Sequence, residues 1–106
     1  MTYKCISIED AKTLIAAKDV SLADIRDAGS FLAGNISNSV NVSDHNLEQY
    51  LLATDKDAPM IVVCYHGNSS QQAAAFFMQQ GFTKVHSVDG GMDNWRQLYP
   101  DTLTSA

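Results

Sequence analysis

A cysteine stands where a run of apolar residues ends, in the stretch MIVVCYHGNSSQQAAAFFMQQG. Residues 60–63 have the composition of a buried strand, Cys64 follows them, and residues 70–80 have the composition of a helix. The candidate substrate-binding loop after the cysteine consists of Tyr65, His66, Gly67, Asn68, Ser69 and Ser70. A thiol at the end of a buried strand, directly before a polar loop, is placed to act as a nucleophile.

The segment around this loop carries no charged side chain. Between residue 58 and residue 83 there is no Asp, Glu, Lys or Arg, and His66 is the only near-neutral titrating group besides the thiol. An anion would therefore be held by backbone N–H groups, hydroxyls and the N-terminus of the helix, with Gly67 supplying the freedom for the turn. Such surroundings favour the thiolate of Cys64. These residues alone leave a second interpretation open, because free cysteine is also a common small core residue.

Four other titratable residues are weighed for supporting roles. Asp24 and Arg26 end a predicted strand and would share a sheet edge with Cys64, where a structural ion pair is favoured over contact with a substrate. His66 could stabilise the thiolate or orient an acceptor, but a solvent-exposed loop imidazole is the favoured interpretation. Cys5 is interpreted as a structural or bystander thiol rather than a resolving cysteine.

Strands and helices are expected to alternate along the chain. Strands are predicted at residues 3–6, 20–25, 39–42, 60–64 and 84–88, and helices at residues 8–17, 28–33, a segment after Asp44, 70–80 and a segment after Gly91. This alternation predicts an α/β fold whose sheet is covered on both faces, in one domain spanning residues 1–106. Such sheets bind ligands beyond the carboxyl ends of their strands, and Cys64 lies at one of these ends.

Local residue choices predict where the helices begin and end. Gly81 is expected to end a helix in a Schellman motif, with Phe82 packed on Phe77, and residues 102–106 are expected to fray. The expected helix N-caps are Ser7, Asp44 and either Ser69 or Ser70.

Composition argues against several classes of function. Seven Lys and Arg against twelve Asp and Glu give a net charge of −5, so neither a nucleic-acid surface nor a basic membrane-surface helix is expected. No apolar run approaches the roughly 20 residues of a membrane span, and the first residues lack the apolar core of an export signal. We therefore expect a cytoplasmic protein with reduced thiols. Its cysteines and histidines lack metal-ligand spacing, so no metal is expected.

Three blocks of the sequence carry a family resemblance. CYHGNSS, preceded by an apolar strand, resembles the active-site loop of the rhodanese family. LADIRDAGSFLAGNISNSVNV is similar to the family's N-terminal block, and KVHSVDGGMDNW is similar to its C-terminal block, where Gly-Gly precedes a helix carrying Trp. The blocks stand in family order from about residue 7 to residue 100, and they most resemble short, single-domain bacterial members.

The resemblance implies a three-layer α/β/α domain with a central, mostly parallel five-stranded sheet. It also implies a thiosulfate sulfurtransferase that works by double displacement through a Cys64 persulfide and needs no cofactor. The amides of residues 65–70 would hold thiosulfate and stabilise the persulfide anion. The acceptor of the sulfur would be cyanide in an assay, or a small thiol or thioredoxin-like dithiol in a cell.

The chain departs from the family pattern at three places. Its loop lacks the Lys or Arg that family loops often carry, Gln71 stands where similar members tend to have Lys, and Asn35 replaces the His of Gly-His-Ile. Because amides lower a thiol pKa less than a cation does, we expect weak thiosulfate binding and activity that rises into alkaline pH. The change at Asn35 is expected to affect the rigidity of a structural corner rather than the chemistry.

Competing functions are separated by single features of the loop. A cysteine phosphatase needs an Arg six residues after the cysteine to clamp phosphate, and this chain has Ser70 there. A non-catalytic rhodanese-like binding module commonly lacks the cysteine that this chain retains. A persulfide carrier fed by a protein donor needs the same loop, so it stays open as an alternative.

Overall fold

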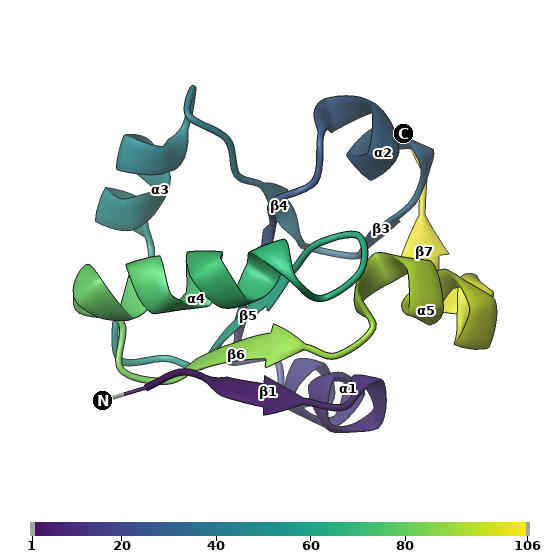
Figure 1. The fold of residues 1–106 in the computed structure, drawn as a ribbon, viewed down its shortest axis with the longest axis horizontal. Helices are drawn as coiled ribbons and strands as arrows, with labels where there is room; N and C mark the ends of the chain where they lie inside the picture. Colours follow the sequence, from purple (N-terminus) through teal and green to yellow (C-terminus); the bar gives the residue numbers. More distant parts are fainter. Residues whose placement is uncertain (1, 106) are drawn as a thin grey trace.

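The computed structural model describes residues 2–105 and shows strands alternating with helices (Figure 1). The strands are β1 (Lys4–Ile6), β2 (Ser21–Asp24), β3 (Asn35–Ile36), β4 (Val40–Asn41), β5 (Met60–Val63), β6 (Val85–Val88) and β7 (Leu103–Thr104). The helices are α1 (Ile8–Ala16), α2 (Ala28–Ala33), α3 (Leu47–Ala53), α4 (Ser69–Gln79) and α5 (Gly91–Leu98), followed by a 3₁₀ turn at Pro100–Thr102. None of the helices in the described part of the chain is long and apolar enough to cross a membrane.

Five strands form one sheet in the order β1-β6-β5-β2-β4, and all its neighbouring strands are parallel. β5 lies at the centre and all four of its residues are buried, as expected of a strand covered on both faces. The register pairs Asp24 of β2 with Val63 of β5, and Ser87 of β6 with Val62. Parallel pairing therefore brings the residues after β2, β5 and β6 to one edge of the sheet.

Helices cover both faces of the sheet, which confirms the expected three-layer α/β/α domain. On one face, α1 and α5 pack against Leu22, Ile61 and Val63 through a buried cluster that includes Trp95. On the other face, α3 and α4 pack against the side chains of alternate strand residues, around Phe77. Figure 1 shows α4 and α1 on opposite sides of β6, and β6 pointing toward α5.

The expected helix ends are partly confirmed. The Ser7 hydroxyl accepts from the Asp10 N–H at 3.0 Å and caps α1. At the end of α4, Gly81 has φ +102° and the Phe82 N–H reaches the Phe77 carbonyl at 3.2 Å, as expected. The expectation for Asp44 is wrong: α3 begins at Leu47 with Asn46 in the N-cap position. The Asn46 side chain faces backward, accepting from the Ser43 N–H and donating to the Asn41 carbonyl, so it ties the loop before the helix.

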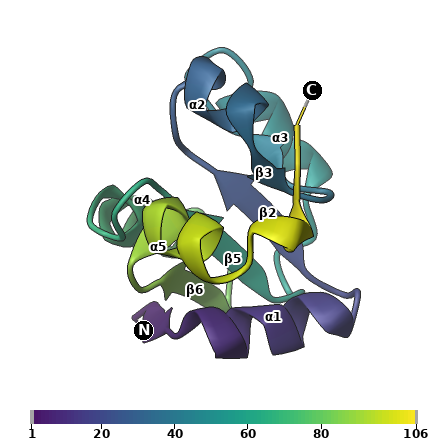
Figure 2. The same ribbon diagram turned by 90° about the vertical axis from the view of Figure 1, so that its right-hand side faces the viewer.

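The expected fraying of the last residues is also wrong for the described part of that segment. β7 pairs antiparallel with β3 in a separate two-stranded sheet, with Leu103 opposite Ile36 and Thr104 opposite Asn35 (Figure 2). Leu103 packs against the core, and the Trp95 indole N–H donates to the Thr102 hydroxyl at 2.8 Å. These contacts with residues distant in sequence order the segment; Ala106 lies outside the described residues.

Candidate active site

Cys64 is the first residue after the central strand, and it is buried, with 5% of its surface exposed. The loop turns back over it because Gly67 adopts φ +90°, and the Gly67 N–H donates to the Cys64 Sγ at 3.1 Å. A Cβ at Gly67 would lie 2.9 Å from the backbone N of Gly90, so glycine is required both for its φ and for the close approach. The turn thus aims a backbone donor at the sulfur, as the sequence predicted.

The six loop residues divide into an exposed set and a buried set. Tyr65, His66, Asn68 and Ser69 are exposed at the mouth of the loop, whereas Gly67 and Ser70 are buried beneath them. α4 begins at Ser69, and Asn68 occupies the N-cap position without a side-chain hydrogen bond. The expectation that Ser69 or Ser70 caps this helix is therefore wrong. Ser70 lies inside the first turn, where its hydroxyl pairs with Ser87 at 2.7 Å.

Opposing influences act on the pKa of the Cys64 thiol. Burial is the largest single influence and raises the pKa, because it penalises the thiolate. The hydroxyl and N–H of Ser70, with the N–H groups of Gly67 and His66, lower the pKa by hydrogen bonding to the anion. Together these donors outweigh burial, so the pKa of Cys64 lies below its ordinary value. The loop therefore favours the thiolate without a cation.

The pH dependence of alkylation tests this balance. Thiolate is the species that reacts with iodoacetamide, and its fraction grows as pH rises through the pKa. In a Cys5→Ser background, we expect the alkylation rate of Cys64 to rise with pH and to reach half its plateau below 9.0, the ordinary thiol value. If the alkylation rate of the folded protein reaches half its plateau at or above pH 9.0, burial raises the pKa of Cys64 more than the hydrogen bonds lower it.

Asp24 and Arg26 form a buried ion pair at the same edge of the sheet. Arg26 donates to both Asp24 carboxylate oxygens, at 2.8 to 3.2 Å, and its guanidinium also donates to the Gly34 carbonyl at 2.7 Å. Asp24 is fully buried, and its Oδ1 also accepts from the Arg26 N–H. These contacts fix the turn after β2 against the segment after α2, which agrees with the structural role favoured from the sequence.

The first residues of α5 hydrogen-bond to the backbone of the loop that begins at Cys64. The Met92 N–H donates to the Cys64 carbonyl at 2.8 Å, and the Asp93 N–H donates to the Tyr65 carbonyl at 2.9 Å. Gly91 permits this approach, since a Cβ there would lie 2.6 Å from both carbonyl oxygens. The N-terminus of α5 thereby holds the backbone of Cys64 and Tyr65 in place.

Gln71 and Asn35, where the chain departs from the family pattern, make hydrogen bonds that the sequence did not predict. The Gln71 side chain donates to the Gly67 carbonyl at 3.0 Å and accepts from the Tyr3 hydroxyl at 3.2 Å, so it braces the loop. Asn35 donates to the Phe31 carbonyl at 2.8 Å and accepts from the Thr104 hydroxyl at 3.0 Å. The corner at Asn35, whose rigidity was expected to be affected, thus retains side-chain hydrogen bonds. Cys5, by contrast, is exposed on an edge strand.

His66 lies beside a small charged cluster on α5. Its Nδ1 is 3.8 Å from an oxygen of Asp93, whose other oxygen accepts from Arg96 at 2.6 Å. The imidazole side chain is 66% exposed. Most of its surroundings are solvent, which agrees with the favoured interpretation of a loop imidazole without a catalytic role.

Substitution of His66 tests that interpretation. We expect His66→Gln to leave the pH–rate profile of sulfur transfer unchanged, because a water-exposed imidazole contributes little to the stability of the thiolate. If His66 does assist the thiolate when protonated, the pH–rate profile of the variant differs in shape from that of the wild-type protein. Steady-state rates across neutral pH distinguish the two outcomes.

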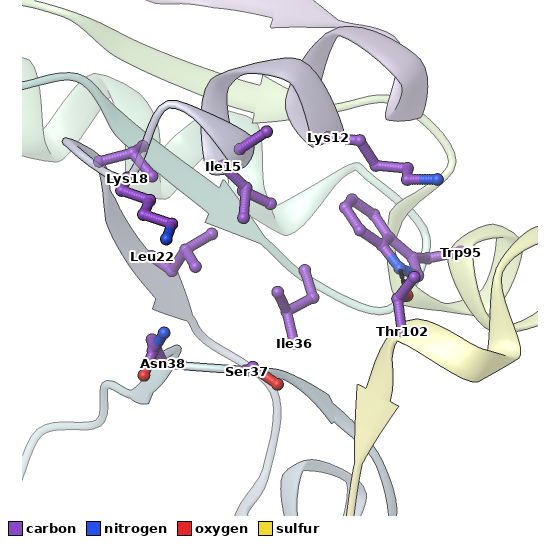
Figure 3. Close-up of a pocket in the computed structure, with 11 residues that line it drawn as sticks. Lys12, Ile15, Lys18, Leu22, Ile36, Ser37, Asn38, Trp95 and Thr102 are labelled. Carbon is purple, nitrogen blue, oxygen red and sulfur yellow. Dashed lines mark hydrogen bonds between the residues drawn. The ribbon is translucent and has the colours of Figure 1, made fainter.

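A small cavity adjoins the loop that follows Cys64. It has a volume of about 310 Å³, and its wall includes Tyr65, Met92, Arg26 and Arg96. A larger cavity, about 660 Å³, lies between α1, β2, the turn after β3 and α5. Figure 3 shows Lys12 and Lys18 at its rim, with Trp95 and Thr102 at one side. Its wall has no thiol, imidazole or carboxylate, so size does not mark the site of chemistry here.

Comparison with known proteins agrees with this geometry. Residues 7–98 match the Rhodanese-like domain. Proteins called thiosulfate sulfurtransferase GlpE are similar to this protein over nearly the whole chain. The one from Pseudomonas aeruginosa is 47% identical, and the match covers 98% of this chain and 94% of the relative. The one from Pseudomonas paraeruginosa is 48% identical, and the match covers 97% of this chain and 94% of the relative. The crystal structure of a rhodanese-related protein from Thermoplasma volcanium superposes with a TM-score of 0.80 at 30% identity, covering 98% of this chain and all of that one. A buried cysteine between a central strand and a hydrogen-bonding loop, within a chain matched along almost its full length, places this protein in the rhodanese family.

Proposed function

We propose that this protein is a thiosulfate sulfurtransferase that carries sulfur on Cys64. The observation that supports this most directly is the buried Cys64 sulfur, 3.1 Å from the Gly67 N–H in a loop whose donors lower the thiol pKa. The relatives that match over nearly the whole chain carry the name thiosulfate sulfurtransferase. No charged side chain between residues 58 and 83 competes with an anionic substrate.

The reaction has two displacements. The Cys64 thiolate attacks the outer sulfur of thiosulfate; a new S–S bond forms, and the bond to the sulfonate sulfur breaks with its electron pair leaving on sulfite. The Cys64 persulfide anion is then stabilised by the amides of the loop. A thiophile attacks the outer sulfur and takes it, which returns Cys64 as a thiolate. No external oxidant or reductant is needed, because the leaving groups carry the electron pairs.

The cavity beside the loop suits the approach of an anion. Arg96 stands on its wall with 56% of its side chain exposed, and the Tyr65 ring lies at the shared boundary with the loop. Asp93 balances part of the Arg96 charge, so attraction of thiosulfate is weaker than it would be toward a free cation. Weak thiosulfate binding, expected from the loop composition, remains part of the proposal. The sulfur acceptor is proposed to be a small thiol or a thioredoxin-like dithiol, with cyanide replacing it in an assay.

Intact mass spectrometry tests the proposal. The Cys5→Ser protein, whose only thiol is Cys64, is incubated with thiosulfate at alkaline pH without reducing agent. We expect one added sulfur, which cyanide then removes with release of thiocyanate. No added sulfur would overturn thiosulfate as donor. That outcome would favour the alternatives, a persulfide carrier fed by a protein donor or a non-catalytic binding module.

A further inference from the structure

The larger cavity, between α1, β2, the turn after β3 and α5, has the size and the floor of a ligand site. Its volume of about 660 Å³ lies within the range of roughly 300–1,000 Å³ that is usual for small-molecule sites. The floor is apolar: Leu22, Ile36 and Trp95 are buried members of the core cluster on this face, and Ile15 packs against them. This cavity, called the α1–α5 cavity below, can therefore take the apolar part of a ligand out of water.

The charge on the wall of the α1–α5 cavity is opposite to that of the whole chain. Lys12 and Lys18 line the wall, and none of the twelve Asp and Glu residues does. The net charge of the protein is nevertheless −5. The carboxylates nearest to the wall in sequence, Asp19 and Asp101, are exposed and lie outside it. Positive charge alone on the wall favours an anion over a neutral or cationic ligand.

The polar groups at the Trp95 end of the cavity already have partners within the protein. The Thr102 hydroxyl accepts from the Trp95 indole N–H at 2.8 Å and donates to the Tyr99 carbonyl at 2.7 Å. The Lys12 ammonium lies 3.6 Å from the centre of the Tyr99 ring. This end therefore suits the apolar part of a ligand better than its charged group.

The polar groups at the other end of the cavity are available to a ligand. Figure 3 shows Lys18 and Asn38 at this end, away from Trp95. The ion pairs in the described part of the chain do not include Lys18, and the side-chain hydrogen bonds described there include neither residue. A lysine ammonium and an asparagine amide both donate hydrogen bonds, so together they suit a carboxylate.

The backbone is also unusual at these two residues. Lys18 has φ +67° and Asn38 has φ +71°, and no other non-glycine residue in the described chain has a positive φ. Lys18 follows the C-cap of α1 and its N–H donates to the Ile15 carbonyl at 3.0 Å, a position where glycine is the usual residue. A lysine held in a conformation that suits glycine points to a use for its side chain.

We infer that the α1–α5 cavity binds a small amphipathic anion, a carboxylate on a medium-length alkyl chain. The carboxylate lies at Lys18 and Asn38, and the alkyl chain extends over Leu22 and Ile36 toward Trp95. None of the residues 64–70 lines this cavity, so it is separate from the proposed sulfur-transfer site. The test below uses no thiosulfate, and its outcome is therefore independent of the proposed function.

The test titrates the protein with octanoate and follows the fluorescence of Trp95, which is the one tryptophan of the chain and lies on the cavity wall. We expect a saturable change, and an affinity that rises about three- to fourfold for each CH₂ added between octanoate and decanoate. Octylammonium has the same chain with the opposite charge and is expected to bind about tenfold more weakly or worse. Isothermal titration calorimetry gives the same affinities independently of the fluorescence.

Variants with matched controls locate the ligand. Lys18→Gln is expected to weaken octanoate binding about two- to fivefold, the range for an exposed charge pair, whereas Lys84→Gln removes an exposed lysine outside the wall and is expected to have no effect. Ala16→Leu fills part of the cavity from the exposed last position of α1 and is expected to weaken binding about tenfold. Ala53→Leu makes the same change at the exposed last position of α3, outside the wall, and is expected to leave the affinity unchanged.

Lys18→Gly separates ligand binding from stability of the fold. Glycine adopts the positive φ at lower cost, so this variant is expected to keep or raise the Tm while it weakens octanoate binding as Lys18→Gln does. Equal affinities for octanoate and octylammonium, or full affinity in Ala16→Leu, would overturn the inference, as would the absence of saturable binding. Octanoate affinity that falls as the protein concentration rises would show that a second copy of the chain covers the cavity, and it would overturn the inference as well.

Discussion

Cys64→Ser is expected to abolish sulfur transfer from thiosulfate and to prevent any added sulfur mass. A serine hydroxyl is about the size of the thiol but is not ionised near neutral pH, and it cannot form a persulfide. Its oxygen still accepts from the Gly67 N–H that now faces the sulfur, so the loop is expected to keep its conformation. We expect turnover to fall on the order of a thousandfold or more, to the level of the assay without enzyme.

The second cysteine provides the control for this experiment. Cys5 is exposed on an edge strand, and no other residue described here depends on its thiol for a hydrogen bond. Cys5→Ser is expected to retain wild-type turnover and the sulfur adduct. Residual sulfur transfer by Cys64→Ser, or an adduct that moves to Cys5, would show that Cys64 is not the carrier. Near-ultraviolet circular dichroism of Trp95, buried in the core, reports whether the variants keep their packing.

The elements that local sequence patterns control were predicted well. The apolar run of β5, the Ser7 cap and the glycine that ends α4 each depend on residues within one turn or one strand. Parallel alternation then brings Cys64 to the carboxyl edge of the sheet, beside the turn after β2. Position along the chain was enough to place Cys64 and the loop after it, since both follow directly from the end of one buried strand.

The features that the sequence did not reveal depend on residues far apart in the chain. β7 exists because it pairs with β3 and because Thr102 accepts from Trp95. Either Ser69 or Ser70 was predicted as the cap of α4, yet the Ser70 hydroxyl pairs with Ser87 on β6. Asp44 and Asn46 are equally plausible caps by type, and the contacts of Asn46 with the preceding loop decide between them. No local pattern encodes such pairings.

The largest effect expected away from the thiol is at Gly91. The residue has φ +62°, which costs an L-residue about 1–2 kcal/mol, and a Cβ there would lie 2.6 Å from the carbonyl oxygens of Cys64 and Tyr65. Both contacts are with backbone, so no side-chain rotation relieves them. Gly91→Ala is therefore expected to push the loop away from α5 and lengthen the bonds that Met92 and Asp93 donate to it. We expect a loss of roughly 2–4 kcal/mol in the free energy of unfolding.

The same displacement moves the sulfur relative to the donors that lower its pKa. Misplacement of a reacting group by about 1 Å is enough to reduce kcat/KM on the order of a hundredfold. Gly34→Ala is the matched control, because Gly34 has an extended backbone and a Cβ there meets only a Leu103 methyl at 3.8 Å, an ordinary contact. We expect that variant to keep near-native Tm and activity. If Gly91→Ala unfolds at the wild-type denaturant midpoint with full kcat/KM, then α5 does not support the Cys64 backbone, and the hydrogen bonds of the loop alone hold the sulfur in place.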